Sequence, residues 1–295
     1  MKLLTFSDAA GARIGLLEDD ETIVDLSVAA PRLPRDMLSF LEGGEALMNA
    51  ARAASGSAAG RLRRPDVTIE SPLRRPPKIL ATGMNYSDHL IEVSGPDAKP
   101  PERPVFFNKQ STSARAPYAS IMLPPESEQL DYEAELAIVI GRRCRRVRAA
   151  DAHRVIAGYT ILNDVSVRDW QRMASTTTMG KSWDTHCPMG PAIVTADEIP
   201  DPVELDIRTF VNGELRQSSN TRNLIFDCRK LIEALSTVFT LEPGDVIATG
   251  TPGGVAAFRP QKDWLKADDV VRVEIERIGH IEARIEPDSI GSFIQ

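Results

Sequence analysis

The hydrophobic and polar positions of this chain form many short alternating runs and few helical ones. Near the start, such runs predict strands at residues 2–6, 12–18 and 21–27. A helical pattern follows near residues 35–54, and the small, basic segment SGSAAGRLRRP after it has the composition of a linker. The apolar content of this first part is modest. We therefore expect a small α/β appendage over residues 1–71.

The remainder, residues 72–295, is richer in β-branched residues and predicts a strand-rich domain. Runs of this kind occupy residues 78–83, 135–141, 156–165, 191–195, 205–213, 245–250 and 270–286. The pair Asn212-Gly213 suits a hairpin turn. The best helical pattern spans residues 226–239. Strands with so few helices favour an α+β fold, a mixed β-sandwich or β-roll, over a doubly wound sheet.

The segment DYEAELAIVIG, residues 131–141, carries the first candidate chemistry. Because successive side chains of a strand point to opposite faces, Glu133 and Glu135 share a face, and the apolar residues on both faces predict burial. Two carboxylates roughly 6–7 Å apart along a buried strand need a compensating charge. A hard divalent cation supplies it. The open alternative is a strand end at which both carboxylates face solvent.

Asp164 lies within the apolar stretch 161–165. By itself it could cap a helix that starts near Arg168. Together with Glu133 and Glu135 it completes a three-carboxylate set suited to Mg²⁺ or Mn²⁺, with water or substrate in the remaining positions. No histidine or cysteine close by in the sequence suggests zinc.

A strand that ends at Gly83 is followed by a short helical pattern that contains His89 and Glu92. Residues three apart share a helix face, and a histidine oriented by a carboxylate is a candidate general base for water. A surface His–Glu pair without a catalytic role is the alternative. The proline-rich stretch that follows, residues 93–105, lacks periodicity and is expected to be a loop of the kind that forms lids.

Two further segments offer groups that stabilise negative charge. Lys181, in GKSWDTHCPMGP, is a candidate for stabilising a developing enolate or alkoxide. Neighbouring His186 and Cys187 lack ligand spacing and are treated as structural. The segment GDVIATGTPGG, residues 244–254, lacks the GK[ST] of a phosphate loop. We expect it to be an active-site turn whose backbone N–H groups and Thr251 hydroxyl hold a carboxylate.

Composition narrows the partners and the location. A net charge of −7 makes nucleic acid and anionic membranes poor partners, and no apolar run is long enough to span a bilayer. A small anionic substrate stays compatible, because a metal or a buried lysine reverses the local field. The three cysteines have no CxxC spacing and the start has no signal-peptide pattern, so a reducing cytoplasm is expected.

These pieces together resemble the fumarylacetoacetate hydrolase family. The segments that carry the resemblance are GMNYSDHLIE, DYEAELAIVIG, YTILNDVSVRDWQ, GKSWDTHCPMGP and LEPGDVIATGTPGG, in the family's order within residues 77–285. The resemblance implies a mixed β-sandwich roll, a homodimer and a Mg²⁺ or Mn²⁺ site. Animal fumarylacetoacetases carry an acidic ligand where this chain has Asn85. We therefore do not count Asn85 as a ligand, and the chain looks closest to the bacterial branch of acylpyruvate hydrolases and 2-hydroxyhepta-2,4-diene-1,7-dioate isomerases.

Residue by residue, the resemblance implies a metal site, a base and substrate contacts. The metal ligands would be Glu133, Glu135 and Asp164. The water-activating pair on a mobile lid would be His89 and Glu92, with Lys181 as the active-site lysine. The substrate contacts would be Tyr86, Gln171 and Thr251.

The reaction that we expect is hydrolysis of a C–C bond in a small 2,4-dioxo acid, an acylpyruvate or a 2,4-dioxo sugar acid. The metal would chelate the 1-carboxylate and 2-oxo groups, and the His89–Glu92 pair would activate a water that attacks the 4-oxo carbon. Lys181 would stabilise the departing pyruvate enolate. The alternative uses the same enolate in an isomerase, a hydratase or a decarboxylase of the oxaloacetate type. A non-catalytic binding protein on the same scaffold is a further alternative.

Overall fold

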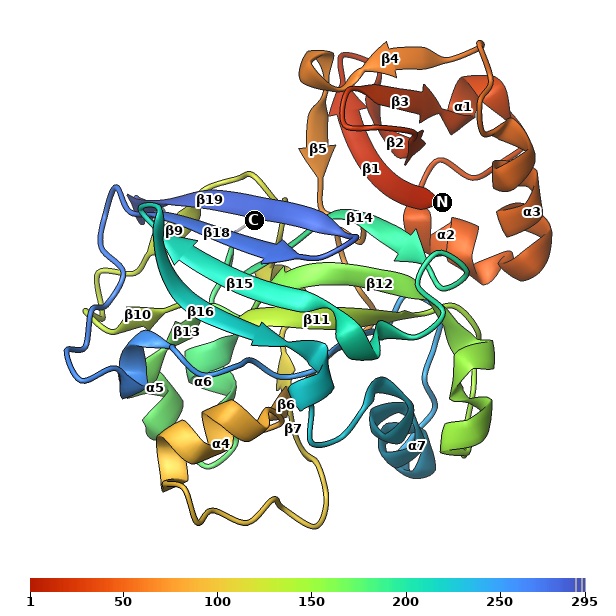
Figure 1. The fold of residues 1–295 in the computed structure, drawn as a ribbon. Helices are drawn as coiled ribbons and strands as arrows, with labels where there is room; N and C mark the ends of the chain where they lie inside the picture. Colours follow the sequence, from red (N-terminus) through yellow and green to blue (C-terminus); the bar gives the residue numbers. More distant parts are fainter. Residues whose placement is uncertain (290, 293, 295) are drawn as a thin grey trace.

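A 12-stranded mixed sheet and a 5-stranded sheet form the framework of this α+β protein (Figure 1). The structure is a computed structural model that describes residues 1–289, 291, 292 and 294. The large sheet runs in the order β4 (Arg61–Arg63), β3 (Thr22–Asp25), β2 (Gly11–Leu17), β1 (Lys2–Asp8), β14 (Cys187–Thr195), β12 (Ile156–Asn163), β11 (Ala134–Ile140), β17 (Val246–Ala248), β6 (Ile79–Gly83) and β7 (Val105–Lys109), with β5 (Thr68–Glu70) beside β1 and β8 (Ala114–Arg115) beside β14.

The second sheet packs on the central strands of the first. It consists of β16 (Glu214–Asn220), β15 (Asp206–Val211), β18 (Val270–Ile275), β19 (Gly279–Pro287) and β9 (Ile121–Leu123). Leu136 and Ile138 of β11 meet Ile207 and Val273 of the second sheet in one apolar cluster. This face-to-face burial is the core of the predicted sandwich, and the expected fold class is confirmed.

The helices are α1 (Leu26–Ala29), α2 (Met37–Glu42), α3 (Gly44–Ala54), α4 (Ser87–Ser94), α5 (Arg168–Arg172), α6 (Thr178–Lys181) and α7 (Cys228–Val238). The predicted helix at residues 226–239 is therefore α7, whose first turn is capped by Asp227 through the backbone N–H of Lys230. The Asn212-Gly213 turn joins β15 to β16, with both residues at positive φ, as the hairpin prediction requires. Within the described residues, no helix has the length and apolar character needed to cross a membrane.

Strand β11 is buried on both faces, as its sequence predicts. Its Ala137 and Val139 point away from the second sheet and join a cluster that contains Phe40 and Leu41 of α2. The two faces of this strand thus contact different layers. Polar groups at its ends are consequently shielded from solvent.

The N-terminal strands continue the large sheet, because β1 pairs with β14 at Lys2↔Val194 and Leu3↔Ile193. The linker prediction for residues 55–65 is wrong in part, since Arg61–Arg63 form the edge strand β4 on β3. Leu62 packs against the N-terminal core, and the two flanking arginines charge an exposed edge. A single apolar residue between arginines gives too little alternation to predict a strand. The division at residue 71 stays a prediction.

Candidate active site

The three predicted metal ligands converge at one end of β11 and β12. In the β11–β12 ladder Ala134 faces Asn163, so the residues just beyond this pair, Glu133 and Asp164, also lie side by side. The backbone N–H of Asp164 donates to the carbonyl of Glu133 at 2.9 Å. One carboxylate oxygen each from Glu133, Glu135 and Asp164 lies within 4.8 Å of the others, and all three side chains are buried. The alternative of a solvent-facing strand end is wrong.

Lys181 joins two of these carboxylates. Its Nζ donates to Oε2 of Glu133 at 2.7 Å and to Oδ2 of Asp164 at 2.8 Å, and its side chain is only 2% exposed. The lysine comes from α6, a single turn that packs directly on α5. A Cβ on Gly180 would overlap the backbone nitrogen of Gln171, so the glycine before the lysine permits this close approach. Asp164 does not cap α5, because that helix begins after Val167 without a side-chain cap.

Two further buried cations, which the sequence analysis did not identify, pair with the carboxylates of the site. Lys109 at the end of β7 donates from Nζ to Oδ1 of Asp164 at 2.6 Å. Arg168 at the start of α5 binds Oε1 of Glu133 at 2.7 Å and Oδ2 of Asp131 at 2.8 Å. Both side chains are buried. No pattern in the sequence separates them from other basic residues, although Asp131 and Arg168 do lie inside the family-like segments.

The metal ligands differ in what balances their charge. Burial raises the pKa of Glu133, but the ammonium of Lys181 and the guanidinium of Arg168 outweigh burial and lower this pKa to about 2. Burial and the nearby carboxylates of Asp164 and Glu133 raise the pKa of Glu135 well above its usual value. No lysine or arginine pairs with Glu135 among the described residues, and its Oε2 accepts only the backbone N–H of Gly250, at 2.5 Å.

This imbalance fits a divalent cation. Four buried carboxylates, those of the three ligands and Asp131, face three buried cations, Lys109, Arg168 and Lys181. When all four are ionised, one negative charge is unbalanced, and Glu135 is the converging carboxylate whose ionisation is disfavoured without a further cation. An all-oxygen donor set that carries uncompensated charge suits Mg²⁺ or Mn²⁺, and carboxylates without thiolate or imidazole disfavour zinc. The residues therefore fit the group that the sequence predicted.

The predicted His89–Glu92 pair lies on α4, where residues three apart share a face. The Nδ1 atom of His89 is 2.8 Å from Oε2 of Glu92. His89 is 6% exposed, and its ring packs edge-to-face with that of Phe258, with 5.6 Å between centroids. It lies close enough to Glu133 for the two side chains to interact electrostatically. The pair is therefore not a solvated surface contact.

The loop after β17 holds protein carboxylates through its backbone N–H groups. Gly250 binds Glu135, and Gly254 donates to Oε1 of Glu92 at 2.9 Å. Further along, Ala256 and Ala257 donate to Asp131 at 2.8 and 3.0 Å. The sequence predicted that this turn holds a carboxylate. The structure identifies carboxylates of the chain itself, including a metal ligand and the partner of the candidate base.

The three predicted substrate residues occupy different surroundings. Tyr86 is fully buried in the main core and its hydroxyl has no hydrogen-bond partner within the described residues. Gln171 is half-buried on α5 and accepts from Nη1 of Arg168 at 2.9 Å, while the Thr251 hydroxyl accepts from Nε2 of Gln217 at 2.8 Å. Their contacts with substrate stay predictions. Asn85 uses both ends of its amide on backbone groups of residues 226 and 249, which suits a structural role.

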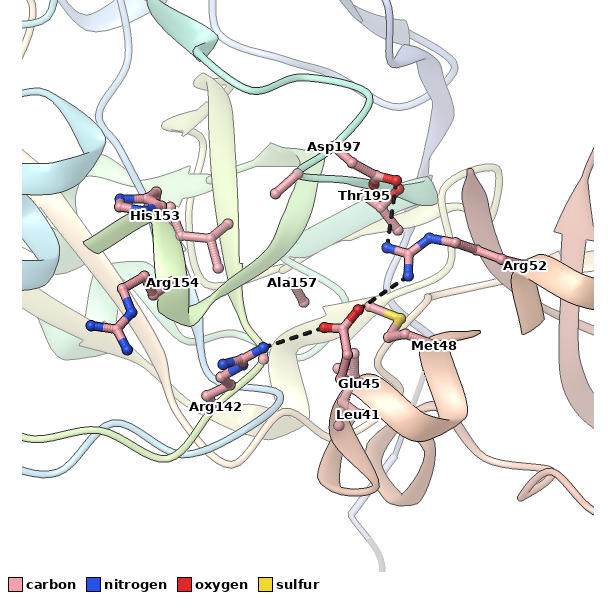
Figure 2. A pocket seen from close by; sticks show the side chains of 14 residues that line it. Leu41, Glu45, Met48, Arg52, Arg142, His153, Arg154, Ala157, Thr195 and Asp197 are labelled. Atoms are coloured by element: carbon pink, nitrogen blue, oxygen red, sulfur yellow. Dashed lines mark hydrogen bonds and ion pairs between the residues drawn. The ribbon is translucent and has the colours of Figure 1, made fainter. Parts of the chain in front are cut away.

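A cavity of about 260 Å³ lies at the opposite ends of the same strands, where α3 meets Gly141 and Ala157 (Figure 2). The separation from the carboxylates is roughly 25 Å along β11, at about 3.3 Å per residue. Glu45 joins Arg52 and Arg142 across its rim, at 3.3 Å each. These half-exposed charges satisfy one another, so we assign the cavity to the junction between the helices and the sheet rather than to the reaction.

Comparison with known protein families places these features in context. A model described as the fumarylacetoacetate (FAA) hydrolase C-terminal domain matches residues 78–286. The chain is 44% identical over 286 residues to the mitochondrial oxaloacetate tautomerase FAHD2B of Bos taurus, covering 95% of this chain and 90% of that protein. It is also 44% identical over 261 residues to the mitochondrial oxaloacetate tautomerase FAHD2A of Homo sapiens, covering 88% and 82%.

Solved structures show the same fold. The fumarylacetoacetate hydrolase of Exiguobacterium antarcticum matches with a TM-score of 0.85 at 36% identity, covering 98% of this chain and all of that one (100%). The maleylpyruvate hydrolase of Sphingobium sp. SYK-6, in complex with manganese(II) and pyruvate, matches with a TM-score of 0.80 at 33% identity, covering 97% and 99%. The homodimer and the cytoplasmic location expected from the sequence stay predictions. The names of the two tautomerases place those proteins in mitochondria.

Proposed function

The chain belongs to the fumarylacetoacetate hydrolase family, and from that premise we propose that it is a divalent-metal-dependent tautomerase of oxaloacetate or a closely related 2-oxo acid. This choice takes the isomerase alternative of the sequence analysis over hydrolysis. The relatives at 44% identity that are named oxaloacetate tautomerases support it. The main structural support is that His89, oriented by Glu92, lies in the same buried site as the ammonium of Lys181 and three converging carboxylates.

Glu133, Glu135 and Asp164 would hold the metal, which when bound supplies charge that orients the 1-carboxylate and 2-oxo oxygens of the substrate and polarises the carbonyl. Lys181 adds a second positive group beside these carboxylates. With a bound divalent ion, the positive charges of the metal, Lys181, Arg168 and Lys109 would exceed those of the four carboxylates by one, which suits an anionic substrate.

Tautomerisation needs one proton to leave carbon 3 and one to reach the 2-oxo oxygen. Glu92 accepts from Nδ1 of His89, so Nε2 carries the lone pair and takes the proton from carbon 3. The electron pair of that C–H bond forms the C2=C3 double bond, and the former carbonyl oxygen becomes negative. Lys181 donates to this oxygen and delivers the proton that completes the enol. Lys181 then takes a proton from water and His89 releases its proton to water, which restores both side chains for the next turnover.

Hydrolysis of a C–C bond is the second candidate. The same His89–Glu92 pair can activate a water, and the structural relative named maleylpyruvate hydrolase supports this chemistry on the same fold. The two candidates differ in a simple way. Tautomerisation leaves the carbon skeleton of the substrate intact, whereas hydrolysis or decarboxylation breaks a C–C bond and releases pyruvate.

The decisive experiment follows oxaloacetate and an acylpyruvate in parallel, with protein stripped by a chelator and then reloaded with Mn²⁺ or Mg²⁺. Enol absorbance reports tautomerisation, and lactate dehydrogenase coupling reports pyruvate. We expect metal-dependent acceleration of enol–ketone exchange with little pyruvate. Metal-dependent pyruvate release from the acylpyruvate, without accelerated exchange of oxaloacetate, would replace the proposal with hydrolysis.

A further inference from the structure

Strand β7 brings two side chains beneath Lys181. Lys109 ends the strand, and Phe107, two residues earlier, lies on the same face. The Nζ atom of Lys181 is 5.0 Å from the centre of the Phe107 ring. The side chain of Lys109 is completely buried. A short edge strand that no sequence pattern identified as functional therefore contributes two side chains that contact the site.

The two buried lysines use their protons differently. The ammonium of Lys109 has three protons and three acceptors: Oδ1 of Asp164 at 2.6 Å, the carbonyl of Val165 at 3.2 Å and the carbonyl of Lys181. The ammonium of Lys181 has two carboxylate acceptors within the described residues. Its third proton is left for a ligand. Lys109 is thus saturated by the protein, whereas Lys181 is not.

The bond from Lys109 to the carbonyl of Lys181 fixes the backbone of a weakly held element. Helix α6 is a single turn that follows Thr177 at φ 59°, and both Met173 before it and Met179 within it are exposed. By binding this carbonyl and Oδ1 of Asp164 together, Lys109 sets the distance between Lys181 and the carboxylate that it shares. The opposite oxygen of Asp164, Oδ2, faces Lys181.

We propose that Lys109 is a positioning residue that fixes Lys181 and Asp164 relative to each other, so that the free proton of Lys181 points at the substrate oxygen. This inference rests on the proposed function, because it assumes that Lys181 acts on an oxyanion. Lys109 itself touches neither the substrate nor the metal. Lys109 acts through Lys181, and a double-mutant cycle of the two lysines measures this coupling.

The experiment compares Lys109→Met, Lys181→Met and the double variant in the full-length protein loaded with Mn²⁺. Loss of a supporting residue of this kind costs roughly 10–100-fold in activity, and we expect that loss in kcat with little change in KM. In the double variant, adding Lys109→Met to Lys181→Met should lower kcat by less than about threefold beyond the loss in Lys181→Met alone. Mn²⁺ affinity should not fall in Lys109→Met, because the variant removes a positive charge next to a ligand.

Lys78 provides the matched control, since it also pairs with a buried aspartate, Asp245, at 2.7 Å. Lys78→Met should leave kcat unchanged. Lys109→Gln keeps donors for two carbonyls and replaces Lys109→Met if the latter fails to fold. Unchanged activity, additive losses in the cycle, or a loss of Mn²⁺ affinity that accounts for the lost activity would each overturn the proposal.

Failure of the proposed function has a separate signature. If the wild-type protein turns over neither oxaloacetate nor an acylpyruvate, the same cycle is measured on oxalate binding to the Mn²⁺-loaded protein by calorimetry. Lys109→Met should then weaken oxalate binding, and the double variant should bind it no more weakly than Lys181→Met. Unchanged or additively weakened oxalate binding would overturn the role of Lys109.

Discussion

The imidazole of His89 and the carboxylate of Glu92 are joined at 2.8 Å between Nδ1 and Oε2. The second oxygen of Glu92 accepts the backbone N–H of Gly254 at 2.9 Å, so both oxygens of this carboxylate are occupied. An ionised carboxylate can only accept, which places the proton of a neutral His89 on Nδ1 and the lone pair on Nε2. The imidazole is thereby prepared as a base at one defined atom.

His89→Ala should lower the rate of tautomerisation by roughly 10²–10⁴-fold, the usual contribution of a positioned general base. Mn²⁺ affinity should be nearly unchanged, because His89 is not among the converging ligands. Steady-state rates and calorimetric titration with Mn²⁺ measure the two quantities. His153→Ala is the control, since that imidazole is exposed and belongs to the distant cavity. Full activity in His89→Ala would place the base elsewhere, and lost Mn²⁺ binding would mean that the ligand set is incomplete.

Glu135→Gln should remove most Mn²⁺ binding and activity while the fold survives. The metal-free variant should melt no lower than the wild type, because no lysine or arginine pairs with Glu135 among the described residues and a neutral amide avoids the cost of ionising a buried carboxylate. Calorimetry and thermal melting with and without Mn²⁺ test both statements. Glu282→Gln is the control, because this half-exposed carboxylate lies 3.6 Å from Arg272 in the second sheet. Wild-type Mn²⁺ affinity in Glu135→Gln would exclude this metal site.

Metal affinity should rise with pH because Glu135 must lose its proton to bind the ion. Burial, Asp164 and Glu133 raise the pKa of Glu135 above its ordinary 4.5, so metal binding at mildly acidic pH should release protons. In the metal-free protein this raised pKa stabilises the fold below pH 4.5, and that stability is lost as pH rises through the folded pKa. The increase in Tm on adding Mn²⁺ should therefore be larger at pH 8 than at pH 5.5.

Calorimetry in buffers of different ionisation enthalpy measures the released protons. Glu135→Gln should abolish the pH dependence along with most of the binding. Equal Mn²⁺ affinity for the wild type across this pH range would contradict the raised pKa and the assignment of Glu135 as a ligand that must ionise.

Residues near 86–105 should exchange backbone hydrogens faster without a ligand than with oxalate and Mn²⁺ bound. Helix α4 is followed by a stretch without regular structure, and polar bonds such as that of Asp88 with Ser219 at 2.5 Å hold the helix over the site. Closure of such a segment excludes water from a reaction. Ser219→Ala should increase the exchange of α4 in the ligand-free protein. Equally slow exchange in both states would argue against a lid.

The sequence by itself determined the elements whose signals are local. Alternation predicted the buried strand β11 and put Glu133 and Glu135 on one face, because a period of two needs no tertiary information. Spacing of three put His89 and Glu92 together on α4 for the same reason. The Asn212-Gly213 hairpin and the capped helix α7 follow from local backbone preferences.

Only the tertiary structure decided which charges meet. Lys109 lies 55 positions before Asp164, and their contact depends on β7 pairing with β6 at the sheet edge, which no local pattern reports. The different pKa shifts of Glu133 and Glu135 have the same origin. Two carboxylates on one strand face are equivalent in sequence, but among the described residues Lys181 and Arg168 form ion pairs with Glu133 and not with Glu135. Electrostatic free energy depends on distance and burial, and long-range packing sets both.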